Sequence, residues 1–284
     1  MKTILIPTDF STNAWNAIVY ALRMFQNHTV KFYLLHTYTP AFYRVDYFLG
    51  GPEFSAIPDL GVDRSVSGLE ETVARIKKQY PNARHSFETI SAFNTLTDEI
   101  QEQCNSKDID LIVMGTQGAS GAKQLFLGSS TVFVIRKAKI PVLAIPEDCP
   151  FRDIENILMP NDYLSACNPK ELEPLIYLAK HYKARINVLH VKAASDLTDQ
   201  QVKNKGRIKE IVKDLPHLFI ELHGESMPSA ILDHADSSDY QLLVMMNRNH
   251  SFFEKILIRQ YVDQIGFHVK IPFLVIRDSS EKYT

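Results

Sequence analysis

Four of the eleven glycines in the chain fall in one short stretch between two apolar runs. The stretch is "VMGTQGASGAKQLFLGSSTVFVIRKAKIPVLAIP", residues 113–146, and its glycines are Gly115, Gly118, Gly121 and Gly128. Gly115 directly follows the run "LIVM", and a glycine at the end of a strand lets a ligand approach the main chain closely. Ser129 and Ser130 open a segment of helical character, where exposed amide groups favour phosphate. The stretch predicts a phosphate site, although a tight loop with a serine N-cap and no ligand also fits these residue types.

Other catalytic patterns are missing or weak. The chain has no GxxxxGKS or GxxxxGKT loop and no GxSxG elbow, so P-loop hydrolysis and α/β-hydrolase chemistry are not indicated. Seven of the ten histidines lie in the second half of the chain. Three of them, His190, His223 and His250, could converge as metal ligands at one edge of a sheet. Because no HExxH pattern or Cys/His spacing accompanies them, scattered structural histidines are favoured and no metal site is predicted.

The sequence repeats itself, so the glycine stretch belongs to one of two copies. The matching pairs are "ILIPTDFS" (4–11) with "ILMPNDYLS" (157–165), "YLLHTY" (33–38) with "NVLHVK" (187–192), "LIVMGTQG" (111–118) with "LLVMMNRN" (242–249), and "IPVLAIP" (140–146) with "IPFLVIR" (271–277). Four matches in the same order indicate two copies of one domain. Pro146 and Pro150 interrupt the pattern where the copies join. We predict domains at residues 1–147 and 152–279.

Within each copy, short apolar runs alternate with longer segments of helical period. The expected strands, such as "LIVM" and "VLAI", are apolar throughout, which is typical of parallel strands covered on both faces. Ser11 can cap the first helix, and Asn168, with Pro169 at the first helical position, can cap the corresponding helix of the second copy. The predicted fold class is α/β, with two tandem doubly wound domains, each a roughly five-stranded parallel sheet flanked by helices.

A long connection, residues 39–68, follows the second expected strand in the first copy alone. Connections of this length usually form a lid or an interaction element. Its aromatic residues fit either packing against the second copy or a position near a ligand, and these are Phe42, Tyr43, Tyr47, Phe48 and Phe54.

Composition and charge restrict the classes of partner. The chain has 284 residues, a net charge of -2 and 45% hydrophobic residues, which is ordinary for a globular protein. These values give no reason to expect nucleic acid or an anionic membrane as a partner. The three cysteines have no disulfide or zinc spacing, and no run approaches the roughly 18 apolar residues of a membrane span. We therefore expect a cytoplasmic protein.

The glycine spacing resembles a known signature. Gly115, Gly118, Gly128 and Ser129 follow the order glycine, two residues, glycine, nine residues, glycine, serine, which is similar to the signature of the ATP-binding universal stress proteins. "ILIPTDFS", "LLHT" and "IPVLAIP" also resemble that family, and the similarity covers almost the whole chain as two tandem domains. The resemblance implies a Rossmann-like fold of the adenine nucleotide alpha hydrolase type, and adenine nucleotide as a ligand.

The resemblance also implies a set of binding residues. The end of the first strand would contact base and ribose, and the Asp9 carboxylate would accept hydrogen bonds from the nucleotide. Thr37 would flank the adenine, where the family often has valine, and Met114 would lie against sugar or base. The loop amides would approach phosphate, and the two serines would bind the outer phosphates. The full set is Pro7, Thr8, Asp9, Thr37, Met114, Gly115, Gly118, Gly128, Ser129 and Ser130. For Asp9, a turn before the helix is an alternative role.

The second copy departs from the signature. On an alignment made at "LLVM", the places of Gly115, Gly118, Gly128 and Ser129 are taken by Asn247, His250, Gln260 and Tyr261. His250 and Gln260 would put side chains where phosphate needs room. Asp162 remains, preceded by Asn161. We expect that this copy has lost triphosphate binding and serves as a partner for the first.

The leading functional hypothesis is a tandem universal stress protein whose first domain binds ATP as a regulatory or stabilising ligand in the stress response. Mg²⁺ would arrive with the nucleotide, because no protein cage for it is evident. A weak nucleotide hydrolase using the same pocket, and a nucleotide-independent interaction protein, stay open as alternatives. The resemblance further implies pairing of the two copies through "IPVLAIP" and "IPFLVIR", and leaves a homodimer of the tandem chain open.

Overall fold

The computed structural model describes residues 2–38, 60–116, 128–192, 196–223, 227–247 and 270–277. In these ranges the strands are β1 (Lys2–Pro7), β2 (Val30–Tyr38), β3 (His85–Phe93), β4 (Leu111–Gly115), β5 (Val142–Ile145), β6 (Asn156–Pro160), β7 (Arg185–Lys192), β8 (His217–His223), β9 (Leu242–Asn247) and β10 (Phe273–Arg277). The helices are α1 (Thr12–Met24), α3 (Leu60–Gln79), α4 (Leu96–Ser106), α5 (Ser129–Lys137), α6 (Glu173–Tyr182), α7 (Asp199–Val212) and α8 (Met227–Ser237). We call β1–β5 with their helices the N-terminal half and β6–β10 with theirs the C-terminal half.

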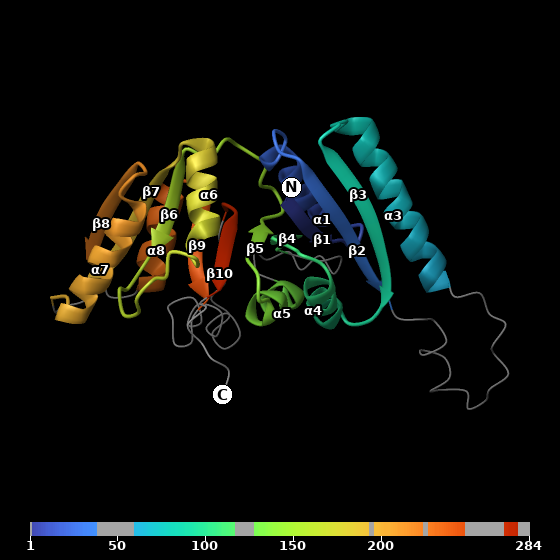
Figure 1. Ribbon diagram of the computed structural model, residues 1–284. Coiled ribbons are helices and arrows are strands. Elements are labelled where there is room, and N and C mark those ends of the chain that lie inside the picture. Colours follow the sequence, from blue (N-terminus) through green and yellow to red (C-terminus); the bar gives the residue numbers. More distant parts are fainter. Residues whose placement is uncertain are drawn as a thin grey trace, which may run out of the picture.

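The ten strands of the described residues form one sheet, in the order β3-β2-β1-β4-β5-β10-β9-β6-β7-β8 (Figure 1). Strands within each half are parallel, and both halves have the same strand order. β5 and β10 pair antiparallel, with Leu143 opposite Leu274, and so join the halves. The predicted fold of two doubly wound α/β units is confirmed, and the final strands pair as the resemblance implied.

Helices cover both faces of the sheet because inner strands such as β4 and β5 are apolar throughout, whereas the edge strands β3 and β8 mix polar and apolar residues. On one face, α1, α3, α6 and α7 pack over a core that includes Ile4, Leu143, Ile157 and Leu274. On the other face, α4, α5 and α8 pack over a second core. Each core continues from one half into the other, so the halves share their hydrophobic interior. In the described ranges, no helix combines the length and the hydrophobicity that a membrane crossing requires.

The helices α1 and α6 occupy corresponding places but begin differently. Ser11 caps α1 as predicted, since its side chain accepts the Ala14 N–H at 3.2 Å. The prediction that α6 starts at Pro169 is wrong, because α6 begins at Glu173, after a turn over residues 169–172. Asn168 still makes the bonds of an N-cap to this turn: its side chain accepts the Lys170 N–H at 3.1 Å, and its own N–H donates to the Glu171 carboxylate at 3.0 Å.

The join between the halves, residues 146–155, has no helix or strand. It is held against α1 by the Asn16 amide, which donates to the carbonyls of Pro146 (3.0 Å) and Cys149 (3.1 Å). The ring of Phe151 packs edge-on against Tyr20, with centroids 5.2 Å apart. These contacts tie the join to the N-terminal half, and the boundaries at residues 147 and 152 stay a prediction.

The long connection of the first copy is described only in part. Residues 60–68 belong to α3, so the last turns of the segment are helical. Residues 39–59, with Phe42, Tyr43, Tyr47, Phe48 and Phe54, lie outside the described residues. Whether these aromatic residues pack against the second copy or lie near a ligand therefore stays open.

Candidate functional site

The sheet order creates two switch points. In the N-terminal half, β2 lies on one side of β1 and β4 lies on the other side. The connections that follow β1 and β4 therefore run in opposite directions from the carboxyl ends of these two strands. Ligands of open parallel sheets bind at such an edge. We call the ends of β1 and β4 the first switch point, and the ends of β6 and β9 in the C-terminal half the second switch point.

The chain turns sharply after β1 at the first switch point. Thr8 is buried, its N–H donates to the Leu35 carbonyl at 2.8 Å, and its hydroxyl accepts the Phe10 N–H at 3.1 Å. The Asp9 carboxylate is exposed and accepts the Ser11 N–H at 3.0 Å. Phe10 has a φ of 64°, a left-handed conformation uncommon for a bulky residue. Asp9 thus has the turn role considered from the sequence, and its contact with a nucleotide stays a prediction.

An aromatic stack holds this turn in place. The ring of Phe10 stacks on His36 at the end of β2, with centroids 4.5 Å apart. His36 Nδ1 lies 2.9 Å from the Ser65 hydroxyl of α3, which also bonds the Ser91 hydroxyl of β3 at 2.7 Å. Burial lowers the pKa of His36, so the neutral ring is favoured at the pH of the cell, although the Asp9 carboxylate opposes this shift.

This stack was not among the features predicted from the sequence. One signal could have revealed it: an aromatic residue after the aspartate and a histidine near the end of the second strand occur in both copies. Thr37, which the resemblance places beside the adenine, directly follows His36 and is partly exposed.

The end of β4 has no room for a side chain. A Cβ on Gly115 would lie 2.8 Å from side-chain atoms of Asn13, a residue of α1 that is 3% exposed. The Thr131 hydroxyl of α5 donates to the Gly115 carbonyl at 3.0 Å, and the Gly128 N–H donates to the Thr116 carbonyl at 2.6 Å. Gly115 is therefore required for the packing of α1 against β4, and the start of α5 is fixed beside the end of β4.

The N-terminus of α5 has no side-chain cap, and the same holds for α6. Ser11, Thr95 and Thr198 cap α1, α4 and α7 with their side chains, whereas the N-cap of α5 is Gly128, which has no side chain. Ser129 and Ser130 follow and are exposed. The first amides of a helix carry partial positive charge, so this end can accept an anion.

Two predicted site residues stand apart from this group. Gly118 lies outside the described residues. Met114 is 5% exposed and belongs to the core under α4 and α5, so its side chain contributes to packing. The end of β1, Thr37, Gly115 and the start of α5 lie at one edge of the N-terminal sheet, as expected for parallel strands.

The strand registers correct the alignment of the second copy. Ile4 pairs with Leu111 in the N-terminal half, and Ile157 pairs with Leu242 in the C-terminal half. Counting on from these pairs, Met246 corresponds to Gly115, and Asn247 corresponds to the next residue, Thr116. The sequence alignment that placed Asn247 opposite Gly115 was wrong by one position, because the apolar run in β9 is one residue longer.

At the second switch point, the described side chains at the β9 end are engaged by the protein. Met246 is 7% exposed and packs in the core that includes Tyr163 and Cys167. The Asn247 amide donates to the carbonyl of Ile135 in α5 of the other half at 3.0 Å. Tyr163, which corresponds to Phe10, also has a positive φ, of 57°, and stacks on His190 with centroids 4.8 Å apart. The second edge keeps the turn of the first, but its β9 end is used for packing and for contact between the halves.

The histidines do not converge in the described part of the chain. His190 is buried and its Nδ1 lies 2.9 Å from the Asn161 carbonyl, while His223 is exposed at the end of β8. Among the described residues, no group of three or more His, Cys, Asp or Glu side chains could hold a metal ion. His250 lies outside these residues.

The fold is that of a tandem, doubly wound α/β protein of the Rossmann-like type, whose two switch points differ at the adjacent strand: β4 ends in Gly115, and β9 has Met246 in the same place. The family model described as the universal stress protein family matches residues 1–146 and again residues 154–277. The chain therefore belongs to the universal stress protein family and contains two of its domains in tandem.

Relatives agree with this assignment. The universal stress protein MJ0531 of Methanocaldococcus jannaschii is 30% identical over 149 residues, which is 51% of this chain and 81% of that protein. A universal stress protein of Thermus aquaticus is 29% identical over 144 residues, which is 51% of this chain and 98% of that protein. The crystal structure of a universal stress protein from Archaeoglobus fulgidus superimposes with a TM-score of 0.71 and 18% identity, covering 99% of this chain and 97% of that one. The last comparison extends the shared fold over both halves.

Proposed function

We propose that the N-terminal half binds ATP at the first switch point, and that the nucleotide is a regulatory or stabilising ligand of a cytoplasmic stress-response protein. The observation that carries the proposal is the start of α5. Its N-cap, Gly128, has no side chain, two exposed serines follow, and the end of β4 is hydrogen-bonded beside it. A helix start of this kind favours phosphate.

Several of the predicted residues then have roles that fit their positions. The first amides of α5 and the hydroxyls of Ser129 and Ser130 donate to the outer phosphates. Asp9 and Thr37, at the ends of neighbouring strands β1 and β2, lie beside the nucleoside. Gly118 completes the glycine spacing of the family signature. The donor set consists of amides and hydroxyls, which fits a phosphate group, and Mg²⁺ would be held mainly by the nucleotide.

A bound nucleotide would stabilise the folded chain by mass action, because only the folded state has the site. The second switch point would contribute no triphosphate site, since Met246 and Asn247 already occupy its β9 end with protein contacts. A homodimer of the tandem chain stays a prediction.

The direct test is Ser130→Asp. An aspartate in the first turn of α5 interacts favourably with the helix dipole and should stabilise the folded chain by about 0.3–1 kcal/mol. Its negative charge would repel phosphate. The variant should keep or slightly raise stability without ligand, while the Kd for ATP rises by about tenfold or more, as calorimetry and thermal unfolding would show.

Two controls separate charge from size and place. Ser130→Asn adds a neutral side chain of the same size and should keep most of the affinity. Gln200→Glu adds a negative charge to the first turn of α7 in the C-terminal half and should leave ATP binding unchanged. Equal ATP affinity in wild type and Ser130→Asp would refute the proposal. If the wild type releases ADP from ATP and Ser130→Asp does not, the protein would instead be the nucleotide hydrolase.

A further inference from the structure

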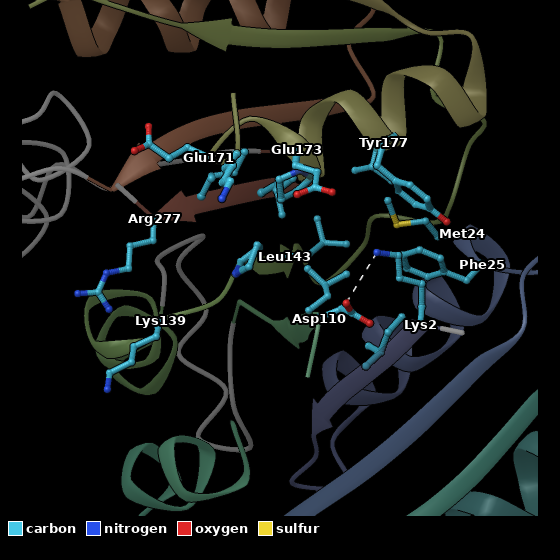
Figure 2. A pocket seen from close by; sticks show the side chains of 18 residues that line it. Lys2, Met24, Phe25, Asp110, Lys139, Leu143, Glu171, Glu173, Tyr177 and Arg277 are labelled. Atoms are coloured by element: carbon cyan, nitrogen blue, oxygen red, sulfur yellow. Dashed lines mark ion pairs between the residues drawn. The ribbon is translucent and has the colours of Figure 1, made fainter. Parts of the chain in front are cut away.

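A cavity lies between the two halves, away from the first switch point. It has a volume of about 420 Å³ and opens over the paired strands β5 and β10. Its floor holds apolar side chains from both halves: Ile4, Leu143, Leu274 and Ile276. Met24 and Phe25 at the end of α1 form one wall, and Tyr177 and Leu178 of α6 form the other (Figure 2). We call it the seam pocket.

The pocket exists because of the antiparallel junction. The helices α1 and α6 each cover the sheet of their own half, and the paired strands β5 and β10 lie between them. The pocket reaches the amino ends of β1 and β4, at Lys2 and Leu111, which is the edge opposite to the first switch point. A ligand here would touch both halves at once without occupying the first switch point.

The acidic groups of the pocket are largely engaged by the protein. Asp110 lies 3.8 Å from the Lys2 ammonium and accepts the Thr3 N–H at 2.8 Å. Glu171 is buried and accepts the Asn168 N–H at 3.0 Å. Glu173 is exposed in the first turn of α6, where the helix dipole favours a carboxylate.

Two basic groups of the pocket are available to a ligand. Lys139 and Lys170 are exposed and form no ion pair with another described residue. Figure 2 shows Arg277 and Lys139 at one end of the pocket, and Lys2, Asp110 and Tyr177 at the other. The Lys2 ammonium also lies 4.7 Å from the centre of the Tyr177 ring. The pocket therefore combines an apolar floor with a cationic end.

We propose that the seam pocket binds an amphipathic organic acid, a small molecule with an apolar body and one anionic head. The body would lie on the floor shared by β5 and β10, and the head would lie near Lys139 and Lys170. The volume is in the range of pockets that enclose a small-molecule ligand. Because its walls come from α1 and α6, such a ligand would stabilise the contact between the halves.

The test uses matched amphiphiles on the full chain. Anilinonaphthalene sulfonate, which has an aromatic body and an anionic head, should bind with increased fluorescence. Decanoate should displace it, whereas decanol and decyltrimethylammonium, with similar apolar chains, should displace it at least about tenfold less well. Equal displacement by all three compounds would overturn the proposed class of ligand.

Variants locate the site. Lys139→Glu with Lys170→Glu should weaken decanoate binding by about tenfold or more, and Glu173→Gln should strengthen it a few fold. Lys180→Glu, an exposed position of α6 outside the pocket, is the charge control and should have no effect. Unchanged decanoate binding in the double variant would overturn the proposal. So would displacement of the dye by ATP in the wild type but not in Ser130→Asp, because the dye would then lie at the first switch point. The nucleotide proposal would be unaffected by this result.

Discussion

The two switch points have the same backbone plan but different side chains. In both, an aromatic residue with positive φ stacks on a histidine of the neighbouring strand: Phe10 on His36, and Tyr163 on His190. They differ at the adjacent strand, where β4 ends in Gly115 and β9 has Met246 in the same place. The comparison teaches that a duplicated fold can keep its turn geometry while the end of the adjacent strand differs, with a glycine in one half and a buried methionine in the other. Substitutions at corresponding positions can test this difference.

The largest effect is expected at Met246. Truncation to alanine in Met246→Ala would leave a cavity in the core beside Tyr163, and such changes cost about 2–5 kcal/mol. Urea denaturation should show the loss as a lower midpoint with an unchanged slope. ATP binding at the first switch point should persist under conditions where the variant is folded. A stability loss of much less than about 1 kcal/mol would contradict a packing role for Met246.

A smaller loss is expected at Gly115. The added methyl of Gly115→Ala would lie 2.8 Å from side-chain atoms of the buried Asn13, and overpacking of this kind costs about 1–3 kcal/mol. Gly206→Ala is the matched control, because a Cβ there meets nothing within 4 Å. Since Gly206 lies inside α7, this change should stabilise the chain by about 0.5–1 kcal/mol. Equal effects of the two substitutions in urea denaturation would show that close packing does not explain Gly115.

The smallest effect, with opposite sign, is expected at Tyr163. Its hydroxyl is buried and has no hydrogen-bond partner among the described residues, and burial raises its pKa. Tyr163→Phe would remove this unsatisfied group and make the position equivalent to Phe10, so we expect a gain of about 1 kcal/mol. The reverse change, Phe10→Tyr, should bring no such gain. A loss of stability in Tyr163→Phe, measured by the same denaturation, would indicate that the hydroxyl has a bonding partner.

Local features of the fold were predictable from the sequence. The Ser11 cap, the start of α5 at Ser129 and the continuously apolar strands follow from residue types over a few positions, and each agrees with the structure. The predicted start of α6 failed because Asn168 caps a turn over residues 169–172 and the helix begins only after that turn, which the residue types at the cap do not show. The alignment of Gly115 with Asn247 failed because an apolar run does not show where its strand register begins.

The candidate site was predictable only in outline. The order of the repeats and the glycine spacing were enough to place Pro7–Asp9, Thr37 and the start of α5 at one edge, since parallel strands end on the same side. The packing of Asn13 against Gly115 and the stack of Phe10 on His36 join segments far apart in the chain, and no local pattern reports such contacts.

The sequence by itself determined that this chain is a duplicated α/β protein with a glycine-rich edge in one copy, because apolar periodicity, capping residues and repeats are local properties. The tertiary structure decided which strands are neighbours, which residue of β9 replaces Gly115, and that a pocket lies where β5 meets β10. These features depend on long-range contacts, whose geometry is set when strand registers and helix packing are fixed together.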